Sequence, residues 1–190
     1  MKPLENEVVQ LLPMEYSHVE GLYKAAQDHR IWEHMSVELL TKEQVVQYVE
    51  DAHEKQKKGT EIAYVIVSKQ KQKIIGATWF LDISKQHERL EIGSTWISPD
   101  HWRTSVNTSC KYLLLKYCFE DIGLNRVQIK TGHKNIRSQK AIERIGAVKE
   151  GVLRNHMITR DGSIRHTVMY SITREEWPQI KLRFERSLLN

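Results

Sequence analysis

Two segments of the chain combine residue types that could hold a phosphate-bearing ligand. Residues 102–108, Trp-Arg-Thr-Ser-Val-Asn-Thr, lead directly into a predicted helix that begins at Val106. The unpaired backbone amides of a helix amino terminus and the helix dipole favour an anion there, and Arg103 could add a charge contact. Residues 125–146 predict a strand, a turn and a basic helix that is capped by Asn135, a preferred N-cap residue. Such a strand and helix can hold an extended, phosphate-bearing ligand against their edge.

The charge of the second segment indicates which class of ligand the protein binds. The formal net charge of +5 is explained by solubility alone, so its distribution is more informative than its total. The basic residues between positions 126 and 144 face one acid, Glu143, and they are Arg126, Lys130, Lys134, Arg137, Lys140 and Arg144. This surface would attract nucleic acid, but no aromatic-interleaved basic groove or groove-reading helix accompanies it. We therefore expect a smaller phosphate-bearing partner and no nucleic acid.

Length and composition are those of an ordinary globular protein. The 190 residues favour one domain spanning residues 1–190, and no apolar stretch approaches a membrane span. The early acids of the amino terminus predict no signal peptide. Cys110 and Cys118 lie about 12 Å apart on a predicted helix, too far for a disulfide, so we expect free thiols and a cytoplasmic protein. The scattered histidines show no metal-ligand spacing, and we expect no metal.

Periodicity and capping signals predict alternating strands and helices. Strands are expected at residues 7–12, 61–68, 73–83, 88–97, 126–131, 147–156 and 164–172. Helices are expected at residues 17–27, 41–59, 106–121 and 135–145, and from residue 173 towards residue 188. Capping boxes predict three of the helix starts, at Ser17, Thr41 and Thr173. The order predicts an α/β (mixed α+β) fold whose sheet has helices on both sides.

Several local motifs occur within this order of elements. They are the strand sequence LEIGSTWISP at 90–99, GLNRV at 123–127, Asn-Ile-Arg-Ser at 135–138 before Ile-Gly-Ala at 145–147, and Asp-Gly at 161–162 before Val-Met-Tyr-Ser-Ile at 168–172. Together they resemble the GNAT acetyltransferases, and within them the branch of the ribosomal-protein N-terminal acetyltransferases. The resemblance covers roughly residues 75–178. It implies a mixed, mostly antiparallel sheet of about six or seven strands.

The resemblance implies acetyl-CoA as the co-substrate. In the family, a loop with the pattern Gln/Arg-x-x-Gly-x-Gly/Ala cradles its pyrophosphate, whereas Trp102, Ser105 and Asn107 stand at those positions here. The missing glycines matter because glycine permits positive φ and a close backbone approach. The loop has therefore two interpretations, a working pyrophosphate site or one that has drifted and binds coenzyme A weakly or not at all. The implied cofactor-binding residues are Trp96, Ile97, Arg103, Thr104, Ser105, Val106, Asn107, Thr108, Asn135, Ser138 and Arg144.

The implied chemistry is a direct attack of a neutral amine on the thioester within a ternary complex. Glu91 is the candidate base, since its side chain points away from its apolar neighbours and a carboxylate in a cleft has a raised pKa. The alternative for Glu91 is a carboxylate that only binds a cationic substrate or pairs with an arginine. The resemblance places Ser138 near the sulfur, where it could protonate or stabilise the departing thiolate. Many relatives use a tyrosine four residues later for that task, and Ile142 stands at that position here. His133 is either a base or an idle turn histidine.

The acceptor is a primary amine that the sequence does not specify. A protein N-terminus and a small-molecule amine, such as a polyamine, an amino acid or an aminoglycoside, both stay open. The resemblance implies that residues 31–40 border the acceptor cleft, and the alternative is that they form only a packed connection between two helices. A homodimer is the default expectation for such an enzyme. The alternative function is a non-catalytic acyl-CoA-binding sensor or interaction module on the same fold.

Overall fold

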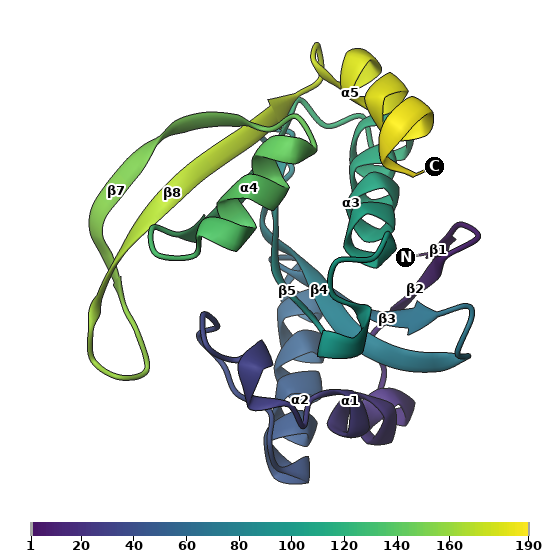
Figure 1. Ribbon diagram of the computed structural model, residues 1–190, viewed down its shortest axis with the longest axis vertical. Helices are drawn as coiled ribbons and strands as arrows, with labels where there is room; N and C mark the ends of the chain where they lie inside the picture. Colours follow the sequence, from purple (N-terminus) through teal and green to yellow (C-terminus); the bar gives the residue numbers. More distant parts are fainter. Residues whose placement is uncertain (1, 190) are drawn as a thin grey trace.

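The computed structural model describes residues 2–189, which form one mixed sheet (Figure 1). Its eight strands, in the order β1-β2-β3-β4-β5-β6-β8-β7, are β1 (Leu4–Glu5), β2 (Val9–Pro13), β3 (Ile62–Ser68), β4 (Lys73–Ser84), β5 (Arg89–Ile97), β6 (Arg126–Gly132), β7 (Val148–Ile158) and β8 (Ile164–Thr173). The α-helices are α1 (Val19–Ala25), α2 (Lys42–Lys58), α3 (Val106–Lys116), α4 (Ile136–Arg144) and α5 (Trp177–Arg183). The predicted fold class is confirmed. The short β1, which the sequence did not predict, accounts for the additional strand.

Helices cover both faces of the sheet and bury two hydrophobic clusters. One cluster joins the sheet to α3, α4 and α5 through residues such as Leu114, Ile142 and Phe184. The other joins it to α1 and α2 through residues such as Leu22 and Val49. Figure 1 shows α3 and α5 together at one end of the molecule and α1 and α2 at the other.

The parallel pair β5–β6 is short. Every other neighbouring pair in the described sheet is antiparallel, whereas β5 and β6 run parallel and are paired only from Arg89–Arg126 to Glu91–Gln128. Farther along β5, a bulge interrupts its pairing with β4, and Ser94 there has a φ of +46°. Because a bulge bends its strand and disturbs the ladder, we attribute the end of the β5–β6 pairing to it. The carboxyl-terminal halves of β5 and β6 therefore part at the centre of the sheet.

The three helices with predicted capping boxes were predicted with unequal accuracy. The capping box of Thr41 and Gln44 and the left-handed Gly59 enclose α2 as predicted. The predicted box at Ser17 is wrong, because Glu15 and His18 cap a short 3-10 turn that precedes α1. The last helix begins at Trp177 and not at residue 173, and of its predicted box only the bond from the Thr173 amide to the Glu176 carboxylate forms.

Candidate active site

The loop between β5 and α3 leaves backbone amides open. The first helical bond of α3 runs from the Ser109 amide to the Ser105 carbonyl, at 2.8 Å. The preceding amides of Asn107 and Thr108 lie at the helix amino terminus, where intrahelical acceptors end. The Val106 amide has only a long contact with the Thr104 hydroxyl, at 3.3 Å. The helix amino terminus on which the predicted anion site depends is therefore formed, and anion binding there stays a prediction.

The missing glycines of the loop cost less than its sequence suggests. Ser105 has a φ of −69° and lies in the ordinary right-handed region, so this position needs no glycine. The left-handed residue of the loop is Arg103, with a φ of +60°. Such a conformation costs a non-glycine residue roughly 1–3 kcal/mol and is typical of functional loops. The backbone strain that loss of a glycine would predict at Ser105 is thus found two residues earlier, at Arg103.

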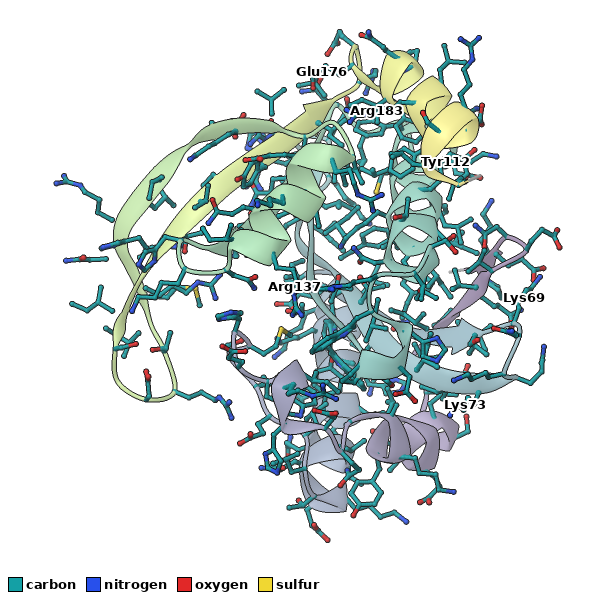
Figure 2. The ribbon with its side chains drawn as sticks, in the orientation of Figure 1. Lys69, Lys73, Tyr112, Arg137, Glu176 and Arg183 are labelled. Carbon is teal, nitrogen blue, oxygen red and sulfur yellow. The ribbon has the colours of Figure 1, made fainter. Side chains whose placement is uncertain are left out.

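Trp102 connects the loop to its surroundings. Its indole Nε1 donates to the Ile97 carbonyl at the end of β5, at 2.7 Å. The guanidinium of Arg137, on α4, lies 4.3 Å from the indole ring centroid, and that of Arg30 lies 5.8 Å from it. Both distances are within the range of cation–π attraction. Arg137 lies in the middle of the view in Figure 2, below α4, and links that helix to the loop.

The amino terminus of α4 is built as predicted. The Asn135 side chain caps the helix by accepting from the Ser138 amide, at 3.0 Å. Ser138 is half-buried one turn into the helix, and Ile142, where many relatives have a tyrosine, is buried in the core. At the other end of α4, Arg144 donates to the Thr108 hydroxyl at 2.6 Å, so α4 and the first turn of α3 touch. The cofactor role of these residues stays a prediction.

Trp96 and Ile97 offer a ligand only their main chain. Their side chains are buried, Trp96 against α2 and Ile97 against the α3 side. The Trp96 indole lies 3.4 Å from the Tyr48 hydroxyl. Because both residues follow the bulge of β5, beyond the last pair with β6, main-chain contacts to an extended ligand are possible there.

Glu91 is buried and paired. Its side chain is 1 % exposed, and its Oε2 lies 3.0 Å from the Lys130 ammonium and 3.0 Å from the Gln128 amide nitrogen. A Cβ at Gly93 would lie 2.7 Å from Oε1, so the glycine makes room for the carboxylate. The pairing matches the alternative expected for this residue, although its partner is a lysine. The role of Glu91 as a base stays a prediction.

His133 is a poor candidate for a base in this structure. Its Nδ1 lies 3.2 Å from both the backbone amide nitrogen and the carbonyl oxygen of His166. The ring is thus engaged by the main chain of β8. The geometry therefore favours the idle interpretation.

Lys111 is a charged residue near the site that sequence reasoning missed. It is 7 % exposed, and its ammonium donates to the Thr95 hydroxyl on the bulge of β5, at 2.9 Å. The Thr95 hydroxyl also contacts that of Thr78, at 2.7 Å. Burial lowers the pKa of Lys111 to about 8, although the neighbouring Cys110 and Glu91 oppose this. The available signal was the run of small and apolar residues around Lys111, which indicates a helix buried on all sides.

Known proteins share this architecture. Residues 9–148 match the model of a family described as the acetyltransferase (GNAT) domain. This chain belongs to the GNAT acetyltransferase family. The match confirms both the predicted family and the predicted enzyme class, an N-acetyltransferase.

Individual relatives of the chain are also described as acetyltransferases. The chain is 31 % identical over 113 residues to the uncharacterized N-acetyltransferase YoaA of Bacillus subtilis, a match that spans 60 % of this chain and 63 % of YoaA. It is 31 % identical over 96 residues to YdaF of the same organism, described as a ribosomal N-acetyltransferase, across 50 % of this chain and 51 % of YdaF. A crystal structure from T. thermophilus, described as that of an acetyltransferase, is 30 % identical, with a TM-score of 0.86 over 97 % of this chain and 96 % of that one.

The residues around the loop fit acetyl-CoA. The cofactor is an extended polyanion, and open amides at the α3 amino terminus lie near Arg103 and Arg144.

Among the helices that the structure describes, none combines the length and the apolar character that a membrane span requires.

Proposed function

We propose that this protein is an acetyl-CoA-dependent N-acetyltransferase that acts on a primary amine in a ternary complex. One observation carries the proposal. The β5–β6 pairing ends at Glu91–Gln128, and the loop that follows β5 leads to the open amino terminus of α3. This arrangement offers a path for an extended thioester whose phosphates lie at α3 and whose acyl end lies between the strands.

Each residue then has a defined task. The amides of residues 103–108 hold the pyrophosphate, the main chain of Trp96 and Ile97 lines the pantetheine, Asn135 binds its amides, and Arg144 reaches an outer phosphate. When bound, acetyl-CoA supplies an activated acyl group. Glu91 accepts the proton of the attacking amine, directly or through water, and a main-chain amide of β5 polarises the carbonyl. The Ser138 hydroxyl stabilises the departing thiolate.

The cysteines support direct transfer without a covalent acyl-enzyme. Cys110 and Cys118 are free and buried in or directly after α3. Burial raises the pKa of Cys110 to about 12 and also raises the pKa of Cys118. Because the nucleophile of a thiol route is the thiolate, neither residue suits that route. Free thiols also fit a reducing cytoplasm, where we place the reaction.

A protein N-terminus is the acceptor that the relatives favour. YdaF is described as a ribosomal N-acetyltransferase and matches half of this chain. Small-molecule amines stay in the panel of acceptors, and we expect the enzyme to act as a homodimer on symmetry grounds.

The burial of Glu91 favours a second candidate, a non-catalytic acyl-CoA-binding module. A carboxylate that is 1 % exposed and bound by Lys130 and Gln128 is not poised to receive a proton unless a ligand rearranges it. Measuring whether the protein acetylates any amine distinguishes the enzyme from the binding module.

The test combines thiol release with product mass. Purified protein, acetyl-CoA and a panel of peptides and small amines are incubated, and free coenzyme A and acetylated amine are quantified. We expect equal amounts of both products, dependence on both substrates, and intersecting double-reciprocal plots. Binding of acetyl-CoA without turnover of any amine would instead support the binding module.

A further inference from the structure

Arg165, on β8, is a half-buried cation whose guanidinium is unpaired among residues 2–189. The guanidinium forms no hydrogen bond or ion pair with these residues, and its Nε is buried. Buried arginine donors normally have partners, because an unsatisfied charged donor destabilises the fold. Burial lowers the pKa of Arg165, and Glu91 opposes this shift. An unpaired, half-buried cation of this kind suggests that a ligand supplies its partner.

Strand register places Arg165 on the same face of the sheet as Glu91. Glu91 is paired with Gln128, and Gly132, four residues along β6, is paired with Thr167. Paired residues share a face, as do residues two apart on a strand, so Glu91, Gln128, Gly132, Thr167 and Arg165 share one.

Gly132 makes room for the guanidinium. A Cβ at this position would lie 3.3 Å from Arg165 Nε, closer than most real contacts. Gly132, the last residue of β6, thus lets the Arg165 side chain lie against the end of this strand. On the proposed reaction, this is the side from which the amine approaches Glu91.

The charges of this face select against polycations. Lys130 and Arg165 provide two positive groups, and Glu91, the acid that opposes the lowered pKa of Arg165, already pairs with Lys130. A polyamine or aminoglycoside would bring further positive charge next to an arginine that forms no ion pair among residues 2–189. A carboxylate suits that arginine, because its planar fork matches the two oxygens.

We propose that Arg165 anchors a carboxylate of the acceptor, so that the substrate class is an amine that also carries a carboxylate. This inference rests on the proposed function and deepens it. The carboxylate has two sources, the α-carboxylate of a free amino acid or the side chain of an acidic residue beside a peptide N-terminus.

The test uses acceptors that differ only in this group. One arm compares peptide amides with Asp or Asn at the second position, the other compares free amino acids with their carboxamides, and spermidine represents polycations. We expect kcat/KM to favour the carboxylate in one arm by about tenfold or more, and spermidine to be poor. Equal use of the carboxylate and amide members in both arms would overturn the proposal.

Variants assign the preference to Arg165. Arg165→Met should abolish the preference and leave acetyl-CoA affinity unchanged, and Arg165→Lys should restore part of it. Arg154→Met, at an exposed position on β7, is the matched control and should keep the wild-type preference. Thermal unfolding checks that each variant folds. A preference that survives in both Arg165 variants would contradict the assignment.

A binding measurement keeps this test separate from the proposed function. Calorimetry with the same acceptor pairs, in the presence of coenzyme A, needs no turnover. If acetyl transfer fails but carboxylate acceptors bind selectively and lose that selectivity in Arg165→Met, the anchor stands and the enzyme proposal falls. If transfer occurs without selectivity, the enzyme stands and the anchor falls.

Discussion

Replacing Lys111 with methionine should stabilise the protein at neutral pH. Lys111 is buried in α3, and the one hydrogen bond of its ammonium, to Thr95, joins it to a neutral hydroxyl. Methionine has a similar length and no charge, so the variant removes the buried ammonium and keeps most of the packing. The Thr95 hydroxyl keeps its contact with Thr78 and is not left unsatisfied.

The magnitude follows from the pKa of Lys111. Its fall from 10.5 to about 8 corresponds to a cost of about 3 kcal/mol for the charged form in the folded state. Losing the Thr95 hydrogen bond destabilises the variant by about 1 kcal/mol. We therefore expect the free energy of unfolding to rise by about 2 kcal/mol net at pH 7.

The sign of the pH dependence is fixed by the same pKa. The folded-state pKa lies below the unfolded value, so the cost is fully present below about pH 8. It fades as the pH rises towards 10.5, because the unfolded chain then binds more protons than the folded one. The gain of Lys111→Met should therefore shrink to nearly zero by about pH 9.5.

Urea unfolding followed by circular dichroism at pH 7 and pH 9.5 measures both quantities. Lys116→Met, at the less buried end of α3, is the matched control and should change little at either pH. A Lys111→Met variant that is less stable at pH 7, or whose difference from the wild type does not depend on pH, would refute the reasoning.

Four further substitutions test the packing of the sheet and the roles of the site residues. Gly76→Ala should destabilise by roughly 2–3 kcal/mol in urea unfolding, because the new Cβ would lie 2.1 Å from the Trp96 carbonyl oxygen. Gly151→Ala, with open space around it, should be nearly neutral in the same assay. Glu91→Gln should lower kcat by roughly 10²–10⁴ with acetyl-CoA affinity intact, as loss of a general base does, and an unchanged kcat would remove Glu91 from the mechanism. Ser138→Ala should lower kcat by about tenfold or more through its hydroxyl alone, measured by thiol release beside calorimetry of acetyl-CoA.

Features that depend on nearby residues were predictable from the sequence. The Asn135 cap involves a residue three positions away, and the Thr41 box and the Gly59 stop are equally local. The elements of the sheet followed from alternation and turn signals, which act within a few residues. The failure at Ser17 had the same local origin, since Glu15 supplied a competing cap two residues earlier.

Features that depend on distant residues were not predictable. The pairing of Glu91 with Lys130 requires the register of β5 against β6, which no local pattern encodes. The residues around Lys111 indicate a buried helix, but the contact of its ammonium with Thr95 depends on how α3 packs against β5. Alternation along β8 gives the face of Arg165, but only the fold of the described residues shows that its guanidinium has no hydrogen-bond partner among them.

Calorimetric titration of the protein with acetyl-CoA tests the central claim most directly. A Ser105→Trp variant places a bulky side chain at the start of α3, and Ser187→Trp places the same side chain at an exposed position outside the loop. We predict saturable binding to the wild type and to Ser187→Trp, and its loss in Ser105→Trp. Absence of binding to the wild type, or equal binding by both variants, would contradict the cofactor site at residues 103–108.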